Sequence, residues 1–305
     1  MEDVYTHLNG TQERIKPEES KIQRVLMRRI AFFTSIFLPV LWVVFLSADG
    51  LSQNGPWKRM NEGLSLAEFD PPQKPLVKDS KIVILKIDPQ YYSFKLLCAS
   101  ELGKIRLTAK EWCRRYGLLS AINAGMYQKD GLTNVGYMKT FSHVNNPRLN
   151  SAYKAVLAFN RVEPAVPEIQ IIDLKCQDFD AVKSRYQTFV QNIRMISCTQ
   201  ENVWAKQDRM WSLAVLGMDK AGNALFIFSE GPYSGHDFNT LLLSLPVSIY
   251  NAMYLEGGPE ASLYFSAHGV ELDQSGIYET GLNESPVRPG ARPIPNIIGI
   301  TKKTK

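Results

Sequence analysis

The segment from Ile30 to Ala48 constrains the chain most, because its nineteen residues include no charged side chain. As an α-helix it would be roughly 28 Å long, close to the ~30 Å hydrocarbon thickness of a bilayer. Asp49 follows it, and the next basic residue after it is Lys58. Basic residues crowd its N-terminal side, namely Lys21, Arg24, Arg28 and Arg29. This asymmetry predicts a single transmembrane helix with the N-terminus in the cytoplasm and the main part of the chain exported.

A cleavable signal peptide is the alternative interpretation of the same segment. The hydrophobic region of such a peptide is usually about 7 to 15 residues long, and Leu46-Ser47-Ala48 is a poor small-x-small cleavage site. An uncleaved signal anchor is therefore favoured. We expect a single-pass protein of the inner or plasma membrane whose main domain is periplasmic or extracellular. No Gly-x-x-x-Gly pattern occurs in the segment, which favours simple anchoring over helix association.

The sequence predicts four regions. Residues 1–29 form a basic cytoplasmic tail and residues 30–48 the anchor. Residues 49–79 are rich in Gly, Pro, Ser, Asn and charge, which predicts a flexible tether. Residues 80–305 remain, a length that suits one large domain or two closely packed lobes.

The formal net charge of +5 says little about partners, because many of the basic residues lie in the tail, in the tether and at the C-terminus. Nucleic-acid binding would require a basic face with interleaved aromatic residues, and the sequence has no recognisable pattern of this kind. We therefore predict no nucleic-acid partner.

The four cysteines, Cys98, Cys113, Cys176 and Cys198, all lie in the part predicted to be exported, where disulfides are permitted. Their spacing includes no Cys-x-x-Cys pair and the histidines are scattered, which argues against a zinc site. Residues 180–196 have apolar side chains at helical spacing, and a straight helix of that length would hold Cys176 and Cys198 too far apart to bond. If these two cysteines pair, the helix must end early and the chain must double back.

The rest of the pattern predicts an α+β domain that is rich in sheet and mixes short strands with a few helices. Shorter helices are expected over 108–116, with Thr108 as the N-cap and Glu111 completing a capping box, and over 238–244. Strands are expected over 81–87, 93–99, 118–123, 155–159, 168–174, 213–217, 224–229, 252–255, 269–272 and 297–300.

The strand predicted over 252–255 ends in Glu256, Gly257 and Gly258, and Glu260 follows two residues later. A strand end of this kind holds a carboxylate at the rim of a sheet, and the glycines allow a tight turn or the close approach of a ligand. Two carboxylates at one rim are candidates for acid and base chemistry. A hairpin with two solvated acids is the structural alternative.

Three further groups of polar residues follow predicted strands or precede them. Asn123 ends a strand and is followed by Ala124 and Gly125; its amide can orient a ligand or cap a turn. Arg209 precedes an apolar strand, where a guanidinium suits a phosphate or pairs with a neighbouring acid. Asp237 lies in a polar loop and is either a binding residue or a helix cap.

These segments resemble the phosphodiester glycosidase family. Ile122-Asn-Ala-Gly-Met-Tyr127 is similar to the family's strand and Asn-Gly-Gly/Ala-Gly-Phe/Tyr turn, Arg209 to Gly217 to its Arg-Ser/Thr-Ala-Ile-Gly strand, and Tyr254-Leu-Glu-Gly-Gly258 to its Leu-Asp-Gly-Gly turn. Arg292-Pro-Ile-Pro-Asn296 resembles the closing segment. In order and spacing these motifs span roughly residues 80 to 300. In the family the acid is usually Asp and small hydroxyl residues follow the glycines; the departures in this chain resemble a bacterial, membrane-linked subgroup.

The resemblance implies a hydrolase that cleaves a sugar-1-phosphodiester in the cell envelope. It implies Glu256 as base or nucleophile, Glu260 as a second carboxylate and Arg209 as the phosphate clamp. Substrate binding is expected from residues around the two turns, namely Asn123, Gly125, Tyr127, Gly257, Gly258 and Asp237. The expected partner is a carbohydrate or sugar phosphate, and no metal or other cofactor is predicted. The alternative is a catalytically inactive envelope protein that binds a glycan or a lipid-linked sugar.

Overall fold

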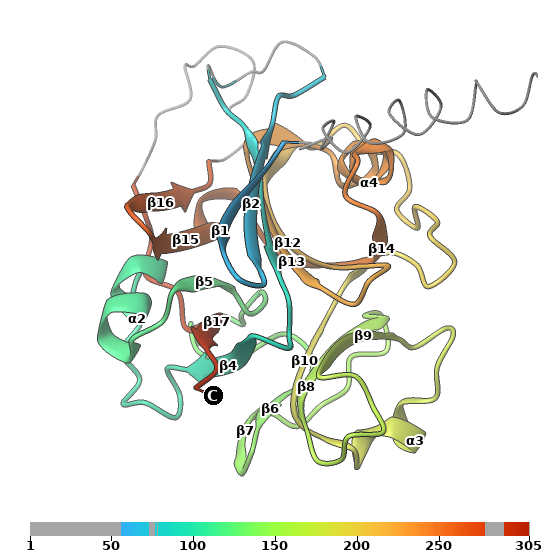
Figure 1. The fold of residues 1–305 in the computed structure, drawn as a ribbon. Coiled ribbons are helices and arrows are strands. Elements are labelled where there is room, and N and C mark those ends of the chain that lie inside the picture. The colour runs from blue at the N-terminus through green and yellow to red at the C-terminus, as the bar shows by residue number, and fades with distance from the viewer. Residues whose placement is uncertain (1–55, 73–76, 78, 278–289, 305) are drawn as a thin grey trace, which may run out of the picture. The chain divides into compact units, whose positions relative to one another are not determined.

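The computed structural model describes residues 56–72, 77, 79–277 and 290–304 (Figure 1). The chain divides into two units, residues 1–54 and 55–305, and all described residues belong to the second. The predicted tail and anchor lie outside the described residues. Within the described part, no helix is long and apolar enough to cross a membrane.

Three antiparallel sheets form the described domain (Figure 1). The seven-stranded sheet has the order β1 (Trp57–Asn61), β2 (Leu64–Phe69), β3 (Ile82–Ile87), β13 (Ala224–Tyr233), β12 (Trp211–Asp219), β14 (Ile249–Gly257) and β11 (Arg194–Ile196). One five-stranded sheet has the order β7 (His143–Asn146), β6 (Met138–Thr140), β10 (Tyr186–Asn192), β8 (Ala155–Arg161) and β9 (Ile169–Asp173). The other has the order β16 (Val270–Ser275), β15 (Ser262–Ala267), β5 (Ser120–Asn123), β17 (Asn296–Lys302) and β4 (Tyr92–Cys98).

Few helices accompany the sheets: α2 (Ala109–Tyr116), α3 (Phe179–Lys183), α4 (Gly235–Ser244) and the 3₁₀ turn η1 (Gly258–Glu260). The capping box predicted for the first of these is confirmed, since Thr108 accepts from the Glu111 N–H while the Glu111 carboxylate accepts from the Thr108 N–H. The sheet-rich α+β class is likewise confirmed, and each predicted strand overlaps a strand of the structure.

The predicted tether is wrong over residues 57–69, which form the hairpin β1–β2 at the edge of the seven-stranded sheet. Leu64, Leu66 and Phe69 are buried there. Gly63, at a φ of 70°, allows the chain to turn between the two strands. A high content of prolines and polar residues around this segment concealed a short strand pair with alternating apolar side chains.

The predicted long helix over 180–196 is also wrong beyond Lys183. The helix α3 ends there, and β10 follows at Tyr186. The chain doubles back, as it had to for Cys176 and Cys198 to bond, and these two cysteines form a disulfide. Cys98 and Cys113 are free and buried.

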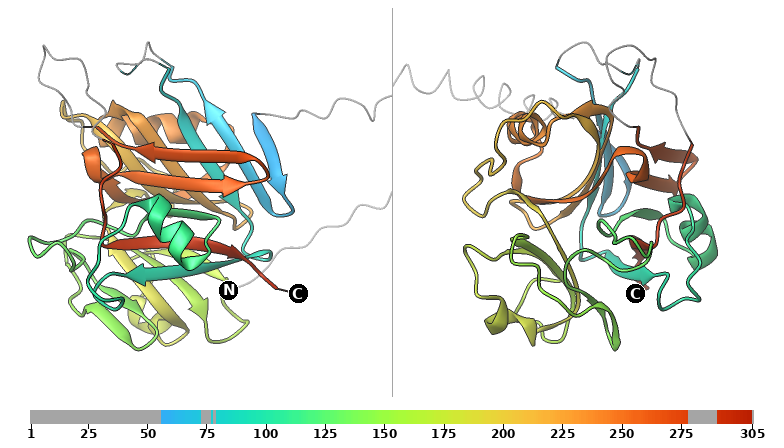
Figure 2. Two further views of the ribbon diagram at one scale, coloured as in Figure 1. Left: turned by 90° about the vertical axis from the view of Figure 1, so that its left-hand side faces the viewer. Right: turned by 180° about the vertical axis from the view of Figure 1, so that it is seen from behind.

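The core lies on both faces of the seven-stranded sheet. One face packs against the two five-stranded sheets through residues such as Phe226, Phe94 and Leu157. The other face packs against α4 through Phe238 and Leu242, on the inner side of the sheet's curve (Figure 2, right). Helix α2 covers the outer face of the sheet that contains β5 and β17 (Figure 2, left). The strand ends that carry polar residues are therefore held by packing on both sides.

Candidate active site

Three strand ends meet at one edge of the seven-stranded sheet. Strand β14 runs antiparallel to β12, and Glu256, near the end of β14, pairs with Ala214, near the start of β12. Strand β13 lies on the other side of β12, and its last residue, Tyr233, pairs with Trp211. This edge therefore gathers the end of β14, the start of β12, the end of β13 and the helix α4 that follows β13.

Glu256 is a buried acid, with 8% of its surface exposed. Its Oε1 accepts a hydrogen bond of 3.0 Å from the Gly257 N–H. Among the described residues, no basic side chain forms an ion pair with it. Burial raises the pKa of the Glu256 carboxyl to about 8; the Gly257 N–H opposes this shift, and the negative charge of Glu260 adds to it. At neutral pH this carboxyl is mostly protonated and is a proton donor.

Gly257 and Gly258 have structural reasons to be glycine. A Cβ on Gly257 would collide with the Trp211 ring and the Tyr254 hydroxyl. Gly258 opens η1 with a φ of 65°, in the left-handed region that favours glycine. The predicted tight turn is confirmed, and it brings Glu260 back toward the end of β14.

Glu260 is held by two contacts that cross the fold. The Arg292 guanidinium donates from Nη1 to Oε1 of Glu260 at 2.7 Å. The Asn123 amide donates from Nδ2 to the Glu260 carbonyl oxygen at 2.9 Å, and its Oδ1 accepts from the Ser262 N–H at 2.7 Å. Asn123, at the end of β5, therefore fixes the turn that carries Glu260. Its predicted role as a direct substrate ligand stays a prediction.

The segment after β5 brings Tyr127 close to both acids. Burial raises the pKa of the Tyr127 hydroxyl, and the negative charges of Glu260 and Glu256 raise it further. Gly125 turns the chain here at a φ of 151° and lies close to Asn134, whose Oδ1 would be 2.6 Å from a Cβ at this position. The Asn123 turn and the Glu256 turn therefore lie side by side, joined by the hydrogen bonds of the Asn123 amide.

Arg209 and Asp237 lie at the same edge but do not contact the acids. Arg209 is exposed, and its Cζ lies 6.0 Å from the centroid of the Trp211 ring. Asp237 lies in the first turn of α4, where its N–H donates to the hydroxyl of the N-cap Ser234 and its carboxylate accepts from that hydroxyl. The N-cap of α4 is therefore Ser234, and the alternative role of Asp237 as the helix cap is wrong, because the helix begins two residues before it at Gly235. The phosphate-clamp role of Arg209 stays a prediction.

Sequence reasoning missed an aromatic wall beside the acids. Trp204 lies 5.7 Å from Tyr254 and 6.4 Å from Trp211, centroid to centroid. Burial raises the pKa of the Tyr254 hydroxyl, and the charge of Glu256 adds to the shift, so the acid lies within electrostatic range of this hydroxyl. Two tryptophans within the polar stretch from residue 197 to 211 were the available signal. Arg292 was noticed only as part of a closing motif.

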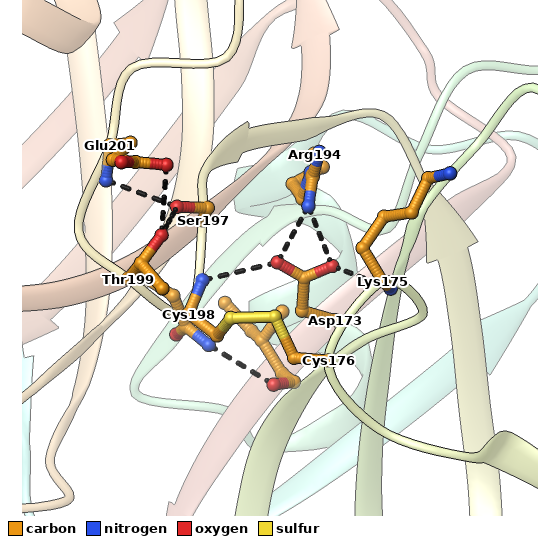
Figure 3. The surroundings of a disulfide bond; sticks show 10 residues. Asp173, Lys175, Cys176, Arg194, Ser197, Cys198, Thr199 and Glu201 are labelled. Atoms are coloured by element: carbon orange, nitrogen blue, oxygen red, sulfur yellow. Dashed lines mark hydrogen bonds and ion pairs between the residues drawn. A yellow bond between two sulfur atoms is a disulfide. The ribbon is translucent and has the colours of Figure 1, made fainter.

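One group of side chains in the described part has metal-ligand spacing: Asp173, Cys176 and Cys198. The two sulfurs of this group bond to each other, and Asp173 binds Arg194 through both of its oxygens (Figure 3). This corner is therefore explained by a disulfide and an ion pair. The expectation that no metal or other cofactor is needed stays a prediction.

Comparison with known proteins agrees with the motifs. The family model of the phosphodiester glycosidases matches residues 116–301. The catalytic domain of zebrafish N-acetylglucosamine-1-phosphodiester α-N-acetylglucosaminidase, auto-inhibited by its pro-peptide, is similar in fold, with a TM-score of 0.54 and 12% identity over 83% of this chain and 85% of that one. A hypothetical protein from Synechocystis has a TM-score of 0.54 and 13% identity, over 82% of this chain and 64% of that one. No curated protein sequence matched the chain.

The family match covers more than half of the chain and includes the Asn123 turn, the strand after Arg209, the Glu256 turn and the closing segment at Arg292. The structural likeness to the zebrafish domain agrees in fold over most of both chains. This chain belongs to the phosphodiester glycosidase family.

Proposed function

We propose that this protein hydrolyses a sugar-1-phosphodiester where β14 and β5 end and β12 begins. The observation that carries the proposal is the pairing of two unlike acids at one turn. Glu256 is buried without a cation among the described residues, whereas Glu260 is bound by Arg292. Glycosidic hydrolysis requires two carboxyl groups in different environments. One must donate a proton to the leaving group, while the other accepts a proton from water or stabilises the positive charge at the sugar.

The reaction breaks the bond between C1 of the sugar and the bridging phosphate oxygen. Water supplies a hydroxyl to C1 and a proton to the site, so the products are a free sugar and a phosphate monoester of the aglycone. In this scheme the Glu256 carboxyl donates its proton, or a hydrogen bond, to the leaving phosphate oxygen. The Glu260 carboxylate, oriented by Arg292 and Asn123, activates water or stabilises the oxocarbenium-like centre.

This assignment differs from the sequence-based hypothesis for Glu256, which was base or nucleophile. A carboxyl whose pKa is about 8 is protonated in most molecules at pH 7, which favours an acid in the free protein. The partly buried rings of Trp204 and Trp211, whose centroids lie 6.4 Å apart, supply an apolar surface against which a sugar ring can pack. Arg209, above Trp211, remains our candidate for the phosphate clamp.

We further propose that the protein acts in the cell envelope, anchored by residues 30–48. The disulfide between Cys176 and Cys198 supports this location, because disulfides form and persist in oxidising compartments. The anchor itself lies outside the described residues, and its support is the uncharged sequence with basic residues before it.

The test is hydrolysis by the purified full chain of a panel of sugar-1-phosphodiesters, with phosphate-free glycosides of the same sugars beside them. Release of sugar from a phosphodiester, lost in Glu256→Gln and in Glu260→Gln but kept in Lys220→Gln, would support the proposal. Absence of turnover across the panel, with saturable binding of a sugar phosphate, would instead support the glycan-binding alternative.

A further inference from the structure

A groove with a cavity volume of about 510 Å³ lies beside the start of β11, between the segment before β8 and the stretch before β12. Its lining includes three basic side chains, Lys154, Arg194 and Lys206, and no acidic one. Trp204 forms part of its wall. We call it the Lys154–Lys206 groove.

The groove shares Trp204 with the aromatic wall of the candidate active site. The carbonyl oxygen of Ile193, in its lining, accepts from the N–H of Tyr254 at 2.9 Å, two residues before Glu256 on the same strand. The ring of Trp204 lies 5.7 Å from the ring of Tyr254, and its Nε1 donates to the Arg194 carbonyl oxygen at 2.8 Å. One wall of the groove is therefore also part of the aromatic wall beside Glu256.

The segment that carries Lys154 is also tied to that strand end. Gln191 donates from Nε2 to the carbonyl oxygens of Asn150 and Tyr153, at 2.9 and 2.8 Å. The next residue, Asn192, pairs with Ala155 and donates to the carbonyl oxygen of Leu255 at 3.0 Å. Lys154 thus has a fixed backbone position relative to Glu256.

The three basic residues differ in how their charge is balanced. Arg194 is neutralised by Asp173, at 2.9 Å from Nη1 to each carboxylate oxygen (Figure 3). In the described part of the chain, neither Lys154 nor Lys206 forms an ion pair. Asp237, held by Ser234 and His236, lies beyond ion-pair distance of Lys206. Two lysines therefore face the groove with their charge unbalanced at close range.

Two other hollows of the described domain are lined by side chains of different charge. The groove at the opposite end of β14 is lined by Lys220 together with Glu168 and Asp219. The cavity beside β16 is lined by one lysine and by acids that include Glu68 and Asp273. Among these three hollows of the described domain, the lining of the Lys154–Lys206 groove has basic side chains and no acidic ones. It is also the hollow whose lining includes Trp204, which contacts Tyr254.

We propose that the Lys154–Lys206 groove binds the aglycone side of the substrate and selects aglycones that carry a second anionic group, such as another phosphate, beyond the scissile phosphodiester. This inference rests on the proposed function, since it identifies the substrate class for the same site. Lysine is suited to this role, because its compact charge on a flexible stem attracts an anion without requiring one fixed geometry. The two lysine charges are partly exposed to solvent, so their attraction for an anion weakens with added salt.

The experiment compares two substrates of the full chain that have the same sugar-1-phosphodiester. One has a neutral alkyl aglycone, and the other has the same alkyl chain ending in a phosphate. The native protein is expected to prefer the charged substrate about tenfold in kcat/KM, through KM, as two exposed charge contacts allow. The preference should disappear in the double variant Lys154→Gln/Lys206→Gln and persist in Lys220→Gln. Circular dichroism melting confirms that both variants fold.

A second measurement separates failure of the groove from failure of the reaction. Calorimetric titration with an alkyl bisphosphate and an alkyl monophosphate tests binding without turnover. Bisphosphate binding that is lost in the double variant supports the groove, even if no phosphodiester is hydrolysed. Equal kcat/KM for both substrates, with equal bisphosphate binding by the native protein and the double variant, overturns the groove while leaving the hydrolase intact. Absence of both turnover and bisphosphate binding overturns both proposals.

Discussion

Asp173 and Glu256 are both buried acids at the end of a β-strand, but their surroundings are opposite. Asp173, 1% exposed at the end of β9, accepts from Arg194 and from the N–H groups of Lys175 and Cys198 (Figure 3). Glu256, 8% exposed at the end of β14, accepts one N–H, and a second acid lies nearby. The ionised form of Asp173 is therefore stabilised by its partners, whereas the ionised form of Glu256 is not.

The difference separates a structural acid from a candidate catalytic one. A buried carboxylate with a cation and several donors holds its neighbours in place, and beside the disulfide it locks the end of β9 to β11. A buried carboxyl without such partners is destabilising when ionised, so it keeps its proton at neutral pH. An arrangement that lowers stability is expected where the side chain is needed for chemistry.

The largest effect should be on turnover. Replacement of Glu256 by Gln should lower kcat on a sugar-1-phosphodiester about 10³-fold, because a positioned proton donor typically contributes 10²- to 10⁴-fold. The same change of carboxyl to amide at Asp173 should leave kcat within a few-fold at a temperature where that variant is folded. Steady-state kinetics on both variants measures this difference in kcat. An equal loss of kcat in the two variants would contradict the distinction between the two acids.

The next effect is on stability, where substitution of Asp173 should matter more than substitution of Glu256. Asp173→Asn should lower the free energy of unfolding by about 3 kcal/mol, because it removes the buried anion and leaves the partly buried Arg194 charge unpaired. Urea denaturation measures this change. A destabilisation below about 1 kcal/mol would mean that the Arg194 pair does not hold this corner.

A smaller effect concerns the pH dependence of stability. The folded pKa of Glu256, about 8, lies above its ordinary value, so the native state binds one proton more than the unfolded state between these two values. Stability from this group is therefore lost as pH rises through that window. Glu256→Gln should stabilise the protein by a few kcal/mol at pH 9 relative to the native chain, and by little at pH 4. Thermal melting of the two proteins at both pH values measures this effect. An equal difference in melting temperature at pH 4 and pH 9 would contradict it, because Glu256 would then ionise as freely in the folded state as in the unfolded state.

The smallest predicted effect is at Asn123. Its amide holds the Glu260 turn through two hydrogen bonds, each worth about 1 kcal/mol net. Asn123→Ala should lower kcat about tenfold by loosening Glu260, with KM for the sugar phosphate changed less. Asn123→Asp keeps the acceptor for the Ser262 N–H and should recover part of the loss. A rise in KM alone would instead place Asn123 against the substrate.

Local patterns predicted much of the fold and one side of the site. The alternation and length of apolar runs indicated strands such as β3, β4 and β17, and a strand end followed by Gly257 and Gly258 indicated the turn with two acids. Strand β10 was mistaken for a helix because five consecutive residues, Thr188 to Asn192, are buried on both faces of the sheet, which removes the period-two signal.

The partners of the acids could not be predicted, because they come from distant parts of the chain. Arg292 reaches Glu260 across 32 residues, and Arg194 reaches Asp173 across 21. Such pairs depend on how the three sheets pack, which no local spacing reveals. For the same reason, the burial that distinguishes Glu256 from an ordinary solvated acid becomes visible only in the fold.

The dependence of kcat/KM on pH, measured for a hydrolysed sugar-1-phosphodiester, tests the central claim most directly. If Glu256 donates the proton, kcat/KM falls as pH rises through an apparent pKa of about 8, and Asp173→Asn keeps this limb. A rate that instead rises through pH 8 would show that Glu256 acts in its ionised form, and would contradict the account.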